Sequence, residues 1–108
     1  MGSEMAGARI VERPDVMADG VGPILRAGEI ADAVIDAISE DNPDRIVYVT
    51  DRGDYIRIHT IDECHLTRAS LEKYLGRDYA LPRLEIEMPS YSGRISTSDT
   101  EYRWYNMA

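Results

Sequence analysis

The pattern of apolar and polar residues predicts a β-hairpin near the middle of the chain. Residues 45–50 are rich in β-branched side chains, and apolar and polar side chains alternate through residues 55–60. Both patterns are typical of strands, and the four residues between them include a glycine, as tight turns often do. In the second arm we expect Ile56 and Ile58 to face the core and His59 to face outward.

A helical period precedes the hairpin. Ile30, Val34 and Ile38 recur every four residues and predict an amphipathic helix from Gly28 to about Asp41. The residue before a proline avoids the helical conformation, so Asn42-Pro43 marks the end of this helix. Its opposite side carries four acidic residues, which we interpret as a solvated face: Glu29, Asp32, Asp36 and Glu40.

A second, shorter helix is predicted for residues 68–75. Thr67 precedes it as an N-cap, because its hydroxyl can accept a hydrogen bond from a free N–H of the first turn. Gly76 follows it at the position where glycine most often ends a helix. We expect residues 61–66 and 77–83 to be connections between elements.

The rest of the fold depends on residues 84–88, where Leu, Glu, Ile, Glu and Met alternate. This period predicts a strand with one apolar and one charged face, and Pro89 ends its ladder because it has no N–H to donate. The strand would deliver a short polar loop to the surface, made of Ser90, Tyr91 and Ser92 and turned by Gly93.

Two further strands are expected near the ends of the chain. Residues 21–26 form the first, which we place at a sheet edge because it contains Pro23. Residues 101–106 form the last, with Tyr102 and Trp104 on one face.

The order of these elements predicts the α+β class. We expect a two-layer sandwich in which two main helices pack on a mostly antiparallel sheet. Residues 1–20 show no clear period, so we expect a flexible N-terminal tail, and residues 21–108 then form a single domain.

Composition narrows the range of partners. The chain has 108 residues and a formal net charge of −8, which argues against nucleic acid or an anionic membrane surface as a partner. No apolar run approaches the roughly 20 residues of a membrane helix. The single cysteine, Cys64, excludes an internal disulfide and fits the reducing cytoplasm.

No self-contained catalytic set is apparent. Carboxylate-bridged di-iron sites use two Glu-x-x-His pairs, and only Asp62-x-x-His65 has that spacing here. His59, Cys64 and His65 lack a fourth ligand at zinc spacing, and neighbours in sequence do not form a nucleophile and base pair. We therefore expect no catalytic residue, no bound metal and no cofactor.

Four segments together resemble a known family. They are residues 21–29, residues 34–43, residues 66–77 and residues 84–95. They read VGPILRAGE, VIDAISEDNP, LTRASLEKYLGR and LEIEMPSYSGRI. In this order and spacing they resemble the effector, or coupling, proteins of soluble di-iron monooxygenases, the MmoB/DmpM family. The Val-Gly-Pro-Ile opening is most similar to the toluene, alkene and isoprene monooxygenase branch.

The resemblance implies an accessory protein that docks on the hydroxylase component, above the helices that hold the two irons. There such proteins tune substrate and oxygen access and couple NADH oxidation to hydrocarbon oxygenation. It also implies a chain that is monomeric when free. The contact residues that it implies are Asn42, Glu87, Pro89, Ser90, Tyr91, Ser92 and Gly93.

Two other functions are compatible with the residues. One is a small-molecule-binding regulatory module of similar α+β shape, which would need a concave apolar pocket. The other is a small enzyme that uses Cys64 and His65.

Overall fold

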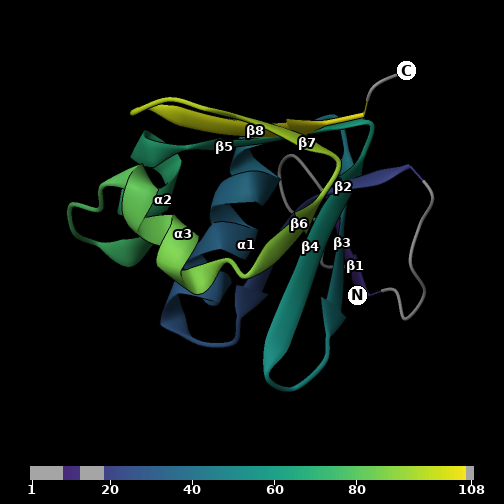
Figure 1. The fold of residues 1–108 in the computed structure, drawn as a ribbon, viewed down its shortest axis with the longest axis horizontal. Coiled ribbons are helices and arrows are strands. Elements are labelled where there is room, and N and C mark those ends of the chain that lie inside the picture. The colour runs from purple at the N-terminus through teal and green to yellow at the C-terminus, as the bar shows by residue number, and fades with distance from the viewer. Residues whose placement is uncertain (1–8, 13–18, 107–108) are drawn as a thin grey trace.

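The computed structural model describes residues 9–12 and 19–106, which form two β-sheets with helices packed against them (Figure 1). The strands are β1 (Arg9–Glu12), β2 (Gly20–Arg26), β3 (Ile46–Asp51), β4 (Tyr55–Ile61), β5 (Glu63–Thr67), β6 (Ser90–Ser92), β7 (Arg94–Thr97) and β8 (Glu101–Tyr105). The helical elements are α1 (Glu29–Asp41), α2 (Arg68–Leu75), the 3-10 turn η1 (Leu81–Arg83) and α3 (Leu84–Glu87).

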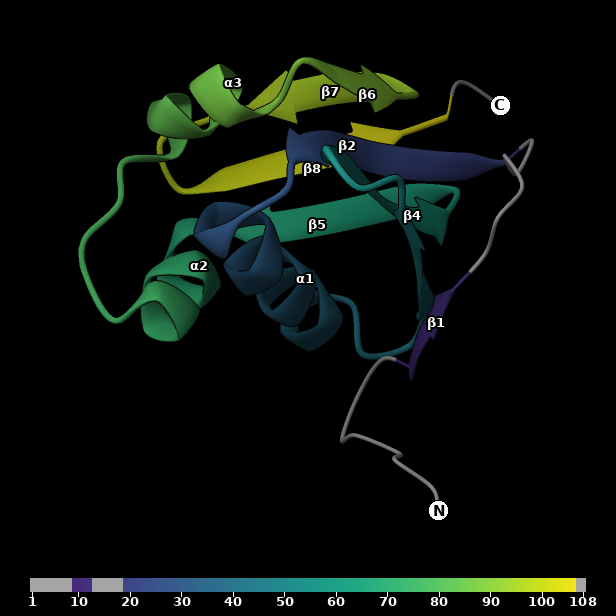
Figure 2. The ribbon, with the colours of Figure 1, turned by 90° about the horizontal axis from the view of Figure 1, so that it is seen from below.

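The first sheet has the strand order β1-β3-β4-β2-β6, and the second has the order β5-β8-β7. Among the described strands, β1 and β3 run parallel and the other neighbouring pairs run antiparallel. The sheets meet at an angle, and α1 lies in that angle with α2 beside it, as two views at right angles show (Figures 1 and 2). The predicted α+β class is confirmed, but the strands form two sheets rather than one.

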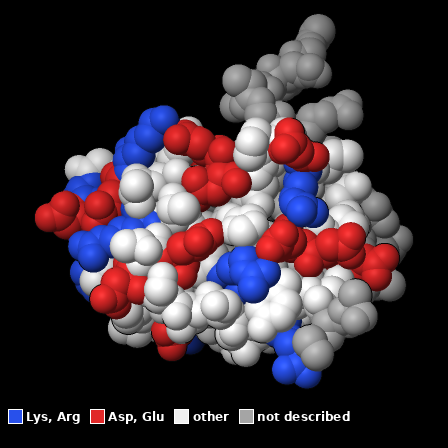
Figure 3. Space-filling view, turned by 90° about the horizontal axis from the view of Figure 1, so that it is seen from above, with Lys and Arg blue, Asp and Glu red and all other residues white. Residues whose placement is uncertain are grey.

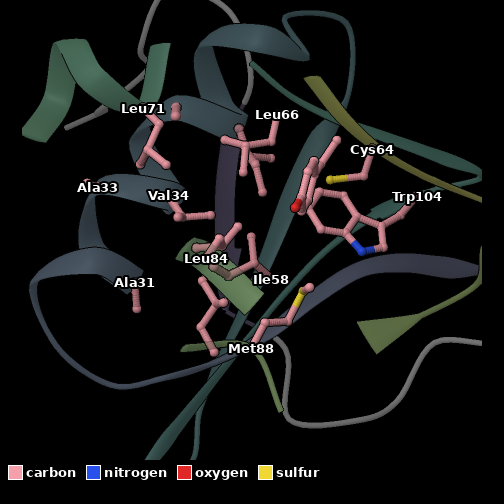
Figure 4. Packing of buried hydrophobic residues seen from close by; sticks show 14 of the residues in the cluster. Ala31, Ala33, Val34, Ile58, Cys64, Leu66, Leu71, Leu84, Met88 and Trp104 are labelled. Carbon is pink, nitrogen blue, oxygen red and sulfur yellow. The ribbon is translucent and has the colours of Figure 1, made fainter. Parts of the chain in front are cut away.

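The core fills the angle between the sheets. Its largest fully buried side chains are Trp104 and Tyr102 of β8, whose rings meet edge to face with centroids 6.2 Å apart. The helix α1 contributes Val34 and Ile38, which are both completely buried, as the four-residue period predicts. Figure 4 shows Val34 in the same cluster as Ile58 of β4 and Trp104. Since the chain has no phenylalanine, its largest fully buried side chains are these tryptophan and tyrosine rings.

Both main helices and their ends are where the sequence places them. Thr67 Oγ1 accepts a hydrogen bond from Ser70 N at 3.2 Å and caps α2. Gly76 ends α2 in the left-handed conformation, with φ of 75°. The hairpin of β3 and β4 and the strand β8 are also confirmed.

The prediction of a strand at residues 84–88 is wrong, because Leu84–Glu87 form the helical turn α3. An apolar residue at every second position fits a strand, but the first and last of three such residues are also four apart and share one face of a helix. Leu84 and Met88 are buried on that face, whereas Ile86 points away with 74% of its surface exposed.

Strands are found in three places where the sequence predicts a connection, a loop or a tail. Residues 61–66 are not a connection, because Glu63–Thr67 form β5, which pairs with β8. The polar stretch Ser90–Ser92 is the short strand β6, and β7 follows it directly. Within residues 1–20, where the sequence predicts a tail, Arg9–Glu12 form β1 on the open edge of β3. Residues 1–8 and 13–18, the rest of that tail apart from Asp19 and Gly20, lie outside the described residues.

The prediction that Pro23 places its strand at an edge is also wrong, since β2 lies between β4 and β6. Pro23 pairs with Tyr91 of β6, and the ladder between β2 and β4 is interrupted at Gly22 and Pro23, so the strand tolerates the missing N–H there. On the other side, a Cβ at Gly22 would collide with the carbonyl oxygen of Ile58, so only glycine lets β2 approach β4 here.

Two consecutive side chains tie the end of α1 to the second sheet. Asn42 Nδ2 donates to the carbonyl oxygens of Ile38 (2.7 Å) and His65 (2.8 Å), and Asn42 Oδ1 accepts from His65 N (2.9 Å). The Asp41 carboxylate accepts from Thr67 N at 2.7 Å and from Ser70 Oγ at 2.6 Å. The C-terminus of α1 is therefore fixed to both β5 and the start of α2.

Asn42→Ala should destabilise the fold strongly. The substitution removes the side-chain partners of His65 O and His65 N at a site that is only 3% exposed, whereas Ile38 O keeps its bond from the backbone N–H of residue 42. We expect a loss of about 2–4 kcal/mol in the free energy of unfolding, measured by urea titration. Asp44→Ala, an exposed position in the same turn, is the matched control and should change it by less than about 0.5 kcal/mol. Equal stability of the two variants would contradict this role of Asn42.

His59 is buried rather than outward-facing, because β4 is an inner strand and His59 pairs directly with Tyr48 of β3. Its Nε2 has no hydrogen-bond partner among the described residues. Burial, with a smaller effect of the positive Arg57, lowers the pKa of His59 from 6.5 to about 4. The folded chain therefore holds this ring neutral at pH 7.

This histidine should make stability depend on pH. The unfolded chain takes up the His59 proton near pH 6.5 and the folded chain only near pH 4, so its contribution is intact above pH 6.5 and declines between these values. We expect this decline to be on the order of 3 kcal/mol. In urea titrations at several pH values, His59→Gln should show a shallower decline than the parent over this range and a parallel curve above pH 7. Identical slopes below pH 6.5 would show that His59 titrates normally in the folded chain.

Candidate docking surface

The residues that the sequence analysis singles out for partner contact lie mainly on α3 and β6. Pro89, Ser90 and Tyr91 are exposed, and Glu87 is half-buried beside them. Figures 1 and 2 both show α3 leading directly into β6. Ile86, Glu87, Pro89, Ser90 and Tyr91 form the candidate docking surface, called the docking surface below.

Ile86 is the member of this surface that sequence reasoning missed. The strand prediction assigns it to the core, whereas the helical turn exposes 74% of it. Leu84 and Met88 are four apart and both buried, a spacing that admits a helical turn as well as a strand (Figure 4). Pro82, within the 3-10 turn just before α3, is a further signal for a helical start.

The turn α3 is held to the second sheet by a hydrogen bond. The hydroxyl of the buried Tyr102 in β8 donates to Glu85 Oε2 at 2.6 Å. Burial raises the pKa of Tyr102 far above its ordinary value, and the Glu85 carboxylate adds to the effect, so the hydroxyl stays a donor at physiological pH. This bond and the burial of Leu84 and Met88 fix the orientation of the docking surface.

Ser92 and Gly93 follow the docking surface in sequence and pack against β2 and β8. Ser92 is half-buried opposite Gly22 of β2. Gly93 has the positive φ (90°) that the sequence predicts, and a Cβ there would lie 2.6 Å from Val21 Cγ1 and 2.8 Å from Tyr105 O. Gly93 therefore lets the chain pass closely between the two sheets, and any other residue would push them apart.

Among the residues that the structure describes, Asn42 makes no hydrogen bond to any of the other six that the sequence analysis singles out for partner contact. Its side chain is buried and engaged with Ile38 and His65, so it holds the fold and is not available for direct contact. The exposed residues of this turn are Pro43 and Asp44. They line an open hollow of about 430 Å³ together with Asp41, Asn42, Arg45 and His65.

Cys64 and His65 point to opposite faces of β5. Cys64 is completely buried in the core, and this burial raises the pKa of its thiol to about 12. His65 lies on the outer face, where Nδ1 is 2.6 Å from Glu101 Oε2. A thiol that stays protonated and faces away from the imidazole cannot act as the nucleophile of a Cys–His pair.

The outer face of the second sheet carries ion pairs. Arg103 donates to Glu63 Oε2 at 2.6 Å, and this bond is the main reason why the pKa of Glu63 is lowered. Arg45 lies 3.6 Å from the same carboxylate. In the space-filling view from this side, acidic and basic side chains are interspersed (Figure 3). The charges of this face largely compensate one another.

The acidic face of α1 is partly paired as well. Glu29 accepts from Arg77 at 3.0 Å, and Glu40 accepts from Lys73 at 2.8 Å and from the hydroxyl of Tyr74 at 2.7 Å. Each bond lowers the pKa of its carboxylate. Glu40 therefore connects α1 to α2, and Glu29 connects α1 to the loop that follows α2.

No group of three or more His, Cys, Asp or Glu side chains is arranged to hold a metal ion in residues 9–12 and 19–106. None of the helices described here is long and apolar enough to span a membrane. A second hollow of about 400 Å³ is lined by Thr67, Arg68, Ala69, Glu72, Thr100 and Glu101. The hollow beside Asn42 is lined chiefly by polar and charged residues, unlike the apolar pocket that a small-molecule-binding module needs.

Comparison with solved structures shows the same fold in regulatory proteins. A chain from a phenol hydroxylase–regulatory protein complex superposes with a TM-score of 0.68 at 23% identity, covering 80% of this chain and 97% of that one. The regulatory protein B of soluble methane monooxygenase superposes with a TM-score of 0.61 at 18% identity, covering 88% and 70%. At these identities the likeness concerns the fold.

Comparison of sequences gives the family. The effector subunit of the alkene monooxygenase system of Xanthobacter autotrophicus (strain ATCC BAA-1158 / Py2) is 59% identical over 85 residues, which are 79% of this chain and 84% of that one. The model of the MmoB/DmpM family matches residues 19–105, which include every helix and every strand from β2 to β8. The chain therefore belongs to the MmoB/DmpM family.

Proposed function

We propose that this chain is the effector subunit of a soluble di-iron monooxygenase and acts by docking on the hydroxylase component. The observation that carries the proposal is the 59% identity to an alkene monooxygenase effector subunit over most of both chains. Catalysis then takes place in the hydroxylase, and this chain works in the cytoplasm as a monomer without a cofactor of its own. Its single thiol, locked in the core, fits an accessory rather than a catalytic role.

The docking surface gives this proposal a structural basis. It combines exposed apolar and hydroxyl-bearing side chains on a turn and a strand that are both anchored in the fold. Preorganised surfaces of this kind bind with little loss of conformational entropy. We infer that Glu87, Pro89, Ser90 and Tyr91 contact the hydroxylase directly, while Asn42, Ser92 and Gly93 hold the shape of the domain.

Docking can regulate the hydroxylase without any chemistry in this chain. A protein that binds one conformer of its partner more tightly than another shifts the partner's population by the difference in affinity. A difference of about 1.4 kcal/mol shifts that equilibrium tenfold. We propose that the favoured conformer differs in access of substrate and oxygen to the irons, which couples NADH oxidation to oxygenation.

Reconstitution should reveal the effector role directly. Steady-state turnover by the hydroxylase that co-purifies with this chain is measured with and without the chain, together with product formed per NADH consumed. We expect both the rate and the yield per NADH to rise when the chain is added, because docking favours the productive conformer. The isolated chain should show no turnover. If rate and yield are unchanged across a full titration, the chain is not an effector of that enzyme.

Substitutions on β6 should weaken docking while the fold stays intact. Ser90→Arg places a long charged side chain on the surface, and Tyr91→Asp replaces a ring that is 41% exposed with a carboxylate. We expect each to raise the Kd for the hydroxylase by about tenfold or more, measured by titration calorimetry. The matched control is Ser96→Arg, an exposed serine about 20 Å further along the same segment. Parent-like binding by both β6 variants would mean that docking uses another surface.

A further inference from the structure

Ile86 is the most exposed of the large apolar side chains whose burial the structure describes. The remaining exposed large hydrophobic residues of the described chain are between 36% and 42% exposed, whereas Ile86 is 74% exposed. It is an aliphatic side chain without a polar atom, so water gives it no compensating hydrogen bond. A single exposed apolar residue is common on protein surfaces, and the surroundings of Ile86 decide what it means.

The backbone that carries Ile86 is immobilised on both sides. Leu84, two residues before it, is completely buried, and Met88, two residues after it, is 9% exposed. Glu85, next to it, is held by the hydroxyl of Tyr102 at 2.6 Å. A side chain presented on a fixed backbone loses little conformational freedom when it enters a pocket. Ile86 thus has the form of a preorganised contact residue.

The charge around Ile86 is negative. Glu85 and Glu87 flank it directly, and residues 84–93 contain no lysine or arginine. Arg83, just before this segment, is turned onto the ring of Tyr79, with Cζ 5.3 Å from the ring centroid. Residues 84–93 therefore carry only negative charge, unlike the outer face of the second sheet, where acidic and basic side chains are interspersed (Figure 3).

We propose that Ile86 is the apolar anchor of the docking surface, and that it enters an apolar pocket of the hydroxylase whose rim carries lysine or arginine side chains. The inference rests on the proposed function and adds to it the residue and the chemistry of the contact. Interface energy is concentrated in a few central side chains that fill pockets, and the charged rim sets the rate of association and the salt dependence.

The test compares two substitutions of equal shape. Ile86→Val and Ile86→Thr both keep a β-branched side chain, but threonine carries a hydroxyl where valine carries a methyl group. Calorimetric titration into the hydroxylase should give a Kd within about threefold of the parent for Ile86→Val and about tenfold higher for Ile86→Thr. Ile46→Ala, on β3 and 37% exposed, is the control for a general loss of apolar surface and should bind like the parent.

The proposed attraction between the acidic residues beside Ile86 and the basic rim of the hydroxylase pocket is tested separately. Glu87→Gln removes one negative charge and keeps the size of the side chain. We expect it to slow association measured by stopped flow and to make the rate less sensitive to salt, with a smaller effect on dissociation. Arg94→Gln lies outside the acidic segment, and slower association by this variant would contradict an attraction between this turn and a basic rim.

The outcomes separate the two proposals. All Ile86 variants should unfold at the parent's urea concentration, because the side chain is mostly in water. If Ile86→Thr binds like Ile86→Val while Ser90→Arg loses binding, the anchor is overturned and the effector function stands. If the parent chain fails to bind the hydroxylase, the effector function is overturned, and the anchor with it.

Discussion

The fold depends on the way in which the end of α1 is fastened. Asp41 bonds to Thr67 and Ser70 at the start of α2, and Asn42 bonds to the backbone of β5, so two adjacent side chains connect one helix to a second helix and to a sheet. The polar atoms involved are largely removed from water, so each would be costly if its partner were lost. With α1 fixed in this position, the apolar residues on its buried side meet both sheets at once.

The docking surface depends on this arrangement indirectly. Leu84 and Met88 can be buried only because the core offers them space beside α1 and β4 (Figure 4). Their burial winds residues 84–87 into a turn, and the turn leaves Ile86 in water. Tyr102 then holds Glu85 from the second sheet. The orientation of the proposed contact residues is thus set by packing inside the domain rather than by the flexibility of a loop.

Sequence reasoning succeeds where a local signal has one meaning and fails where two structures share a pattern. The period of Ile30, Val34 and Ile38, the cap at Thr67 and the glycine at position 76 each specify a helix or its end, and all three are confirmed. Leu84, Ile86 and Met88 fit a strand and a helical turn equally well, and only the tertiary packing decides between them. The strand β5 is missed because it pairs with β8, a partner distant in sequence. The strand β7 forms a hairpin with β8, and it is missed because Ile95 is the only apolar residue among its four, which leaves no alternating pattern. On the candidate site, the sequence locates Pro89, Ser90 and Tyr91 at the surface, but it cannot show that Asn42 is buried.

The passage from β6 to β7 has a mechanical consequence. One short segment pairs with β2 in the first sheet and with β8 in the second, and Gly93 is the single residue between the two ladders. Bending this segment would require breaking hydrogen bonds in both sheets at the same time. The β6–β7 segment is therefore stiff. When a partner protein binds to it, the conformational adjustment is expected in the partner rather than in this segment.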